Sequence, residues 1–218
     1  CFGVNRNAKT PNLDSLIKNG VYFSQAISAA DQTGTSLSSV FTGLFPNRTG
    51  QNQINFKSNI ETYFDFLKKS NYHIYSLIPD ITFFREATIN FGDKTLYVFE
   101  DRKKLQRLED NLGNKIIDKL KSKKMEEPWI YFIHLMDIHT PFSVPDEFDK
   151  KENGETKYDR LVSYVDVWLG KILNHINMKN TLVVITADHG EYIPVTGESI
   201  TEIPRIQHML TKGQTSFS

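Results

Sequence analysis

The chain has 218 residues, of which 39% are apolar and 24% are charged, and its 26 basic residues balance its 26 acidic residues. This composition is that of a globular domain, and the zero net charge excludes an overall field that would attract nucleic acid or an anionic membrane. No run of about 18 apolar residues occurs, so we expect no membrane-spanning segment in this sequence. A single cysteine, Cys1, excludes an internal disulfide framework.

The two ends of the sequence do not look like the ends of a complete protein. The chain begins at Cys1 in a polar segment, shows no signal-peptide pattern, and stops at Ser218 without a terminating element. We therefore interpret residues 1–218 as one domain of a longer protein, truncated at both ends. Its cellular location stays open.

Helical and strand patterns alternate along the chain. Start signals and apolar residues at helical spacing predict helices over 11–17, 36–44, 60–70, 101–124 and 158–176. Short runs of β-branched and aromatic residues predict strands over 21–26, 73–78, 129–135 and 181–185. This alternation predicts an α/β fold, with a mainly parallel, doubly wound sheet flanked by helices and incomplete in this chain.

The last predicted strand ends in a pair of side chains that suit chemistry. The apolar run 182–185 leads directly into Asp188, His189 and Gly190. Ligands in open α/β sheets bind just outside the carboxyl ends of the strands, and a carboxylate with an imidazole is half of a divalent-metal site. The alternative, an Asp that caps a helix followed by a solvated loop His, stays open on this dipeptide alone.

Other polar side chains follow earlier strands or lie near the end of the chain. Thr33 and Ser36 stand just before or in a predicted helix, where a hydroxyl among unpaired N–H groups suits a nucleophile that handles an anion, or simply caps the helix. His139 lies in a loop that Pro141 stiffens. Further along, His208 and Lys212 are natural partners for the oxygens of a sulfate or phosphate ester.

Six segments match, in order, the motifs of one family. They are TPNLDSL at 10–16, GVYF at 20–23, TGLFPNRTG at 42–50, MDIHTPF at 136–142, TADHGE at 186–191 and KGQT at 212–215. Together they resemble the motifs of the sulfatase family of the alkaline phosphatase superfamily, and the match runs through nearly the whole chain. The resemblance implies an alkaline phosphatase/sulfatase-like fold.

The resemblance also implies a nucleophile. Family sulfatases carry a Cys or Ser, converted to formylglycine, nine residues before the Thr that corresponds to Thr42, and this position is Thr33 here. Ser36 matches the motif Ser, whereas Leu37 replaces the motif Arg. Formylglycine is therefore not expected. Phosphodiesterases and phosphoethanolamine or phosphoglycerol transferases of the superfamily use Thr directly, so Thr33 is the expected nucleophile.

Further roles are implied by the same resemblance. Asp188 and His189, together with Thr33, would bind a divalent metal ion, with Ca²⁺ favoured and Mn²⁺, Mg²⁺ or Zn²⁺ open. His139 and Lys212 would contact the ester oxyanion, and His208 and Ser36 are further candidates for the site. The family's first strand, which carries more metal-binding carboxylates, would precede Cys1, so we expect the isolated fragment to bind metal weakly and to be inactive.

The predicted function is a metal-dependent ester hydrolase of the sulfatase family that acts on a sulfuric or phosphate ester. Two alternatives stay open, a phosphoethanolamine- or phosphoglycerol-type phosphotransferase and an inactive anion-binding domain of the same fold. The expected partner is an ester substrate and not a nucleic acid. The sequence leaves the oligomeric state open.

Overall fold

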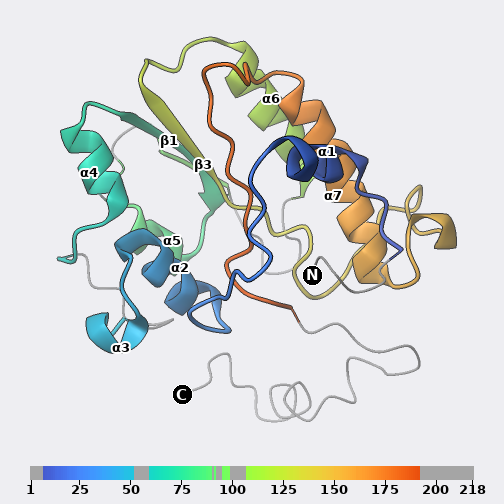
Figure 1. Ribbon diagram of the computed structural model, residues 1–218, viewed down its shortest axis with the longest axis horizontal. Coiled ribbons are helices and arrows are strands. Elements are labelled where there is room, and N and C mark those ends of the chain that lie inside the picture. The colour runs from blue at the N-terminus through green and yellow to red at the C-terminus, as the bar shows by residue number, and fades with distance from the viewer. Residues whose placement is uncertain (1–6, 52–58, 90, 92–94, 99–106, 192–218) are drawn as a thin grey trace.

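A three-stranded parallel sheet forms the centre of the molecule in a computed structural model that describes residues 7–51, 59–89, 91, 95–98 and 107–191 (Figure 1). The strands are β1 His73–Pro79, β2 Thr95–Val98 and β3 Trp129–Ile133, in the order β2-β1-β3. Both neighbours pair with β1 in parallel. Their connections contain helices, as parallel strands require. The predicted parallel α/β fold is confirmed.

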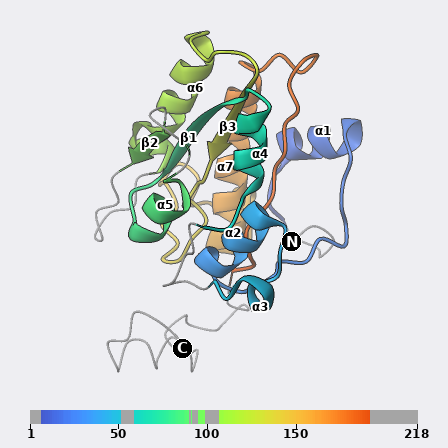
Figure 2. The same ribbon diagram turned by 90° about the vertical axis from the view of Figure 1, so that its left-hand side faces the viewer.

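Helices cover both faces of this sheet (Figure 2). The α-helices are α1 Pro11–Asn19, α2 Thr33–Thr42, α3 Pro46–Thr49, α4 Tyr63–Lys69, α5 Thr82–Ala87, α6 Gly113–Lys121 and α7 Lys157–Leu173, with a π-helical turn η1 at Leu108–Leu112 and a 3₁₀ turn η2 at Lys151–Asn153. α2, α4 and α5 pack on one face, and η1, α6 and α7 pack on the other. Strand β1 is buried on both sides because its side chains alternate between these two layers.

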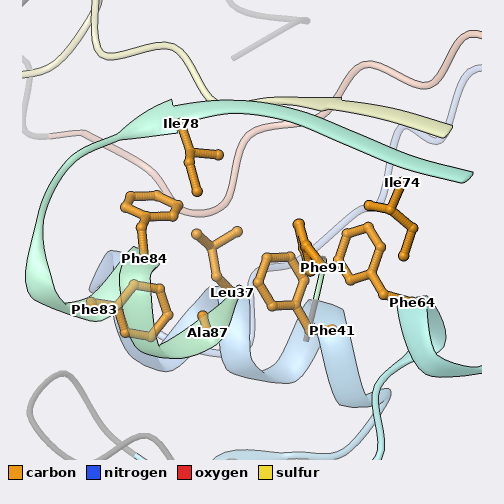
Figure 3. Packing of buried hydrophobic residues seen from close by; sticks show 9 residues of the cluster. All are labelled: Leu37, Phe41, Phe64, Ile74, Ile78, Phe83, Phe84, Ala87 and Phe91. Carbon is orange, nitrogen blue, oxygen red and sulfur yellow. The ribbon is translucent and has the colours of Figure 1, made fainter. Parts of the chain in front are cut away.

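The first layer is an aromatic core, shown in Figure 3. Phe41 of α2 is fully buried and lies edge-on to Phe64 of α4 at 5.2 Å between ring centroids, and to Phe132 of β3 at 5.5 Å. Edge-to-face packing of this kind adds stabilisation beyond that from the burial of apolar area. The members of the aromatic core are Leu37, Phe41, Phe64, Ile74, Ile78, Phe83, Phe84, Ala87 and Phe91. This core fixes α2 against the sheet.

The second layer joins η1, α6 and α7 to the opposite face. Leu77 of β1 points into it, away from the aromatic core. Its buried members are Leu77, Leu108, Leu112, Ile116, Leu161 and Tyr164. On the outer side, buried Asp166 of α7 accepts the backbone N–H groups of Asn12 and Leu13 at 3.1 and 2.8 Å. These are first-turn donors that helix α1 cannot satisfy itself, so Asp166 fixes α1 on α7.

Two predicted strands are wrong. Residues 21–26 and 181–185 are extended or turn-like, but neither is a strand among the described residues. Their apolar side chains are exposed, with Val21 at 82% and Leu182 at 88% relative accessibility. An apolar run becomes a strand only beside a strand that completes its hydrogen bonds, and the described part of the chain places none there.

Two helix predictions also differ from the structure. The helix predicted at 36–44 begins at Thr33, three residues earlier, and ends before Gly43, whose φ of 68° terminates it. The helix predicted over 101–124 is interrupted, because Asn111 has a φ of 76°, and its regular part is α6; residues 101–106 lie outside the described residues. Helix α5 was not predicted. No helix in the described ranges is long and apolar enough to cross a membrane.

Candidate active site

Thr33 is the first residue of helix α2. The preceding residue, Gln32, has an extended backbone (φ −132°, ψ 141°) and occupies the N-cap position, although its side chain makes no capping hydrogen bond. The first N–H groups of α2 and the positive end of its dipole therefore lie around the Thr33 hydroxyl. Leu37 and Phe41 anchor α2 in the aromatic core, and this packing fixes the position of the Thr33 hydroxyl relative to the sheet.

The Thr33 hydroxyl meets the imidazole of His189 across 156 residues of sequence. Thr33 Oγ1 lies 3.1 Å from His189 Nε2. The other ring nitrogen, His189 Nδ1, lies 2.6 Å from the carbonyl oxygen of Gly190. A carbonyl can only accept, so Nδ1 carries the proton and Nε2 keeps its lone pair. The lone pair that faces Thr33 is able to accept its proton or to bind a metal ion.

Asp188 completes a group of three polar atoms. Its Oδ2 lies 3.5 Å from His189 Nε2, is buried, and has no hydrogen-bond partner among the described residues. Tetrahedral ligands at bond lengths of 2.0–2.1 Å are separated by about 3.3 Å, close to the two distances that link Thr33, His189 and Asp188. A buried carboxylate oxygen without a donor is what a cation would satisfy. These three residues therefore fit a metal ion as part of its ligand set.

Ser36 holds the loop of Asp188 against α2. Its hydroxyl donates a hydrogen bond to the main-chain carbonyl of Asp188. The carboxylate Oδ1 of Asp188 accepts the N–H of His189 at 3.0 Å, which leaves Oδ2 pointing elsewhere. Ser36 is buried and lies one helical turn after Thr33, on the same side of α2. It therefore acts on the backbone that carries the candidate metal ligands.

His139 lies on an adjacent loop. Its side chain is exposed, and its Nδ1 donates to the carbonyl of Thr140, which leaves the Nε2 lone pair for a ligand. The next backbone N–H, of Thr140, donates to Glu191 Oε2 at 3.2 Å. Glu191 thus ties the His139 loop to the loop of Asp188 and His189. Sequence reasoning gave Glu191 no role beyond its place in the TADHGE motif.

A third histidine, His134, was missed by the sequence reasoning. Burial lowers the pKa of His134 to about 4, and the charges of Asp188, His189 and His139 act on it as well. Its backbone N–H donates to Leu77 at 3.0 Å, and its ring lies 4.7 Å from that of Phe84. His134 is therefore neutral near pH 7 and faces the candidate site. The signal available in the sequence was its position at the carboxyl end of a predicted strand.

Asp137 is the second group that sequence reasoning missed. It is 1% exposed, and burial raises its pKa to about 6. The N–H of Leu108 and the charge of Arg107 lower the pKa of this carboxyl in part. This buried carboxyl lies two residues from His139 and accepts the N–H of Leu108, so it belongs to the packed structure beneath the candidate site.

Two predicted site residues, Lys212 and His208, lie outside the described residues, as does Cys1. Within the described ranges, no group of three or more His, Cys, Asp or Glu side chains could hold a metal ion. The described candidates are therefore one carboxylate, one imidazole and one hydroxyl, which is a partial ligand set.

The model of the Sulfatase family matches residues 1–212, so the chain belongs to this family. The "ulvan-active sulfatase" of Formosa agariphila is 33% identical over 76 residues, which are 34% of this chain. An uncharacterised Haemophilus influenzae protein is 24% identical over 189 residues, or 84% of this chain. The chain spans only 28% of the length of the Haemophilus protein and 15% of that of the Formosa protein.

Solved structures share the fold. The lipoteichoic acid synthase LtaP of Listeria monocytogenes superposes with a TM-score of 0.56 at 21% identity, over 77% of this chain and 47% of that one. The periplasmic domain of EcEptC from Escherichia coli, in complex with Zn, gives 0.53 at 14% identity, over 76% and 52%. The corresponding domain of the phosphoethanolamine transferase EptC from Campylobacter jejuni gives 0.51 at 19% identity, over 75% and 54%.

Proposed function

We propose that this chain carries part of the active site of a metal-dependent enzyme that cleaves a phosphate ester through a covalent intermediate on Thr33. The observation that carries the proposal is the 3.1 Å contact between Thr33 Oγ1 and His189 Nε2 at the N-terminus of α2. The chain's membership of the Sulfatase family supports ester chemistry in general. The threonine directs the proposal toward phosphorus, since formylglycine formation starts from Cys or Ser.

Each residue would have a defined task. The Thr33 oxygen forms the new bond to phosphorus, and its proton is lost to solvent, because the lone pair of His189 would be bound to the metal ion. The bond from phosphorus to the leaving alcohol breaks, and that alcohol takes a proton that the Nε2 lone pair of His139 relays from solvent. The first N–H groups of α2 stabilise the charge on the phosphoryl oxygens. Lys212 remains a proposed further contact to those oxygens.

A divalent ion held by Asp188, His189 and Thr33 would lower the pKa of the threonine hydroxyl and neutralise charge on the ester. One imidazole with oxygen ligands suits Ca²⁺, Mg²⁺ or Mn²⁺, and the ligand separations near 3.3 Å also suit Zn²⁺. Zn accompanies the EcEptC domain, which is similar in fold. The proposal therefore requires a divalent ion and leaves its identity to elemental analysis.

The acceptor of the phosphoryl group decides between hydrolysis and transfer. Water would make the protein a hydrolase, and an alcohol would make it a phosphotransferase. Two proteins of similar fold are a lipoteichoic acid synthase and a phosphoethanolamine transferase, and this similarity supports transfer. A second candidate, sulfuric ester hydrolysis, is favoured by the 33% identity with the ulvan-active sulfatase over 76 residues.

The test is a comparison of substrates and variants in the longest gene product that contains this chain. Bis-p-nitrophenyl phosphate, p-nitrophenyl phosphate and p-nitrophenyl sulfate are assayed before and after removal of metal by EDTA. Thr33→Ala should lower turnover of the diester at least about 10³-fold, because the nucleophile is lost. EDTA should abolish turnover, and one added divalent ion should restore it.

Thr35→Ala is the matched control, because Thr35 lies in the same helix and has not been placed in the site. It should retain activity within about threefold of wild type. Equal turnover by Thr33→Ala and wild type would refute the proposal. A preference for the sulfate ester would favour the second candidate.

A further inference from the structure

We propose that Arg107 and Asp137 form a buried clamp that positions the loop of His139. The importance of this loop for catalysis rests on the proposed function, whereas the clamp itself rests on contacts in the structure. Two consecutive residues, Arg107 and Leu108, hold the two ends of loop 137–143, and His139 lies between the two attachment points.

The first end of the loop is fixed by Asp137. Its Oδ1 accepts the backbone N–H of Leu108 at 3.0 Å, at the start of η1. Leu108 is fully buried in the second core layer, so this donor cannot move without disturbing that layer. A buried N–H of this kind would cost about 1–3 kcal/mol if it lost its acceptor.

The second end of the loop is fixed by Arg107. One terminal nitrogen of the guanidinium, Nη1, donates to the carbonyl of Ser143, and Nη2 donates to the carbonyl of Pro141 at 3.4 Å. Arg107 is buried, at 8% exposure, although both carbonyls belong to exposed residues. A planar group with several donors is suited to hold two carbonyls at once, which a lysine is not.

Other charged and polar side chains lie near Arg107 and Asp137. Arg107 lowers the pKa of Asp137 and Glu109 raises it, while the hydroxyl of Tyr164 belongs to the same buried region. Burying a guanidinium is costly unless charge and hydrogen bonds compensate it. Arg107 is buried and donates hydrogen bonds to two carbonyls of the loop, which supports a role in fixing the geometry of the loop.

The rest of the loop is consistent with a fixed backbone and a free imidazole. The N–H of His139 donates to Met136 at 3.1 Å, and the N–H of Thr140 donates to Glu191. Ile138 and Phe142 pack against the second core layer. The His139 side chain is exposed. The clamp thus sets where the imidazole of His139 stands relative to Thr33, without touching a substrate, so Arg107 and Asp137 are positioning residues.

The test measures amide hydrogen exchange and kinetics of Arg107→Gln in the longest gene product that contains this chain. Exchange at residues 136–143 should rise at least about tenfold, while exchange in β1 and β3 stays unchanged. If diester turnover is present, kcat should fall about 10–100-fold with KM changed less than about threefold, because misplaced catalytic groups cost rate rather than binding.

Three further variants make the test specific. Arg160→Gln is the matched control, since Arg160 also donates to loop carbonyls, of Gly154 and Glu155, away from the site. It should leave exchange at 136–143 and kcat unchanged. Asp137→Asn keeps an acceptor for the Leu108 N–H and should preserve the loop's protection, whereas Asp137→Ala should lose it.

A double variant separates positioning from general stability. If Arg107 acts through His139, Arg107→Gln combined with His139→Ala should be as slow as His139→Ala alone. Losses that multiply, or unchanged exchange at 136–143 in Arg107→Gln, would overturn the clamp. If wild type turns over no ester, the proposed function fails and the exchange result alone decides the clamp, with a local increase supporting it.

Discussion

The two ends of the candidate site are held by different forces. Thr33 stands on a helix whose aromatic core is closed on the sheet, with Phe41 fully buried. Asp188 and His189 follow a segment whose apolar side chains lie open, with Val184 at 75% exposure. The orange segment 181–191 runs as an extended chain in Figure 1, and α2 lies against the sheet. Packing therefore positions the candidate nucleophile, whereas a few polar contacts position the candidate metal ligands.

Polar contacts with other segments hold the loop of Asp188 and His189 in place. Ser36 donates to Asp188, Thr33 faces His189, and Glu191 accepts from Thr140. A single hydrogen bond contributes about 0.5–1.5 kcal/mol, whereas a buried phenylalanine contributes several times as much. We call the sheet with its packed helices the covered half of the molecule, and the exposed segment 181–191 the open half. We therefore expect substitutions in the covered half to change the free energy of unfolding strongly, and substitutions in the open half to change it little.

Phe41→Ala should have the largest effect on stability. The ring is buried at the centre of the aromatic core, next to Phe64, Phe91 and Phe132. Its loss should lower the free energy of unfolding by about 3–5 kcal/mol. Urea titration followed by circular dichroism measures this, with Val40→Ala on the exposed side of the same helix as the control. A cost below about 1 kcal/mol would mean that this core is loosely packed.

Asp137→Asn should change how stability depends on pH. The pKa of Asp137 rises from 3.8 to about 6 on folding, so the folded protein binds more protons than the unfolded chain between these values. This group's contribution is therefore full below pH 3.8 and is lost as the pH rises through about 6. Asp137→Asn has no such titration. It therefore avoids a decrease in the free energy of unfolding of up to about 3 kcal/mol, at 1.36 kcal/mol per pH unit.

Urea titrations at pH 4, 5, 6 and 7 measure this effect as the difference between the two proteins. The difference should grow in favour of Asp137→Asn as the pH rises, because groups common to both proteins cancel. Parallel stability curves would show that Asp137 does not titrate in this range.

Gly113→Ala should have an intermediate effect. A Cβ at Gly113 would lie 2.3 Å from Cζ3 of Trp168, so the indole ring would have to move. Overpacking of this kind costs about 1–3 kcal/mol and should shift tryptophan fluorescence. In the open half, a Cβ at Gly190 meets no atom within 4 Å, so Gly190→Ala should leave stability unchanged. Equal effects of the two substitutions would remove the contrast between the halves.

Leu182→Ser should have the smallest effect. The side chain is 88% exposed in the structure, so its loss should change the free energy of unfolding by less than about 0.5 kcal/mol. A cost of 2 kcal/mol or more in the longest gene product that contains this chain, measured by the same urea titration, would show that this side chain is covered there.

The sequence predicted the covered half well, because local patterns and packing agree there. The runs 73–78 and 129–135 pair as β1 and β3, and the spacing of apolar residues in 158–176 gives α7. It failed for 21–26 and 181–185, since a β pattern specifies a strand only when a neighbour is present. The pattern carries no information about that neighbour.

Part of the candidate site could be predicted from sequence motifs rather than from packing patterns. Thr33, Asp188 and His189 were named from motifs, and the structure brings them together. His134, Asp137 and Arg107 were not, because their importance comes from burial and from contacts between distant segments. Arg107 meets its carbonyl partners 34 and 36 residues away, and no local pattern encodes such a contact.

The most direct test of the central claim is a search for a phosphoryl group on Thr33. The longest gene product that contains this chain is mixed with a phosphodiester, quenched in acid within one turnover, and digested with trypsin. The peptide 19–48, which contains Thr33, should carry the transferred phosphoryl group, and Thr33→Ala should carry none. Turnover with the group on another residue, or with no residue labelled, would contradict the account.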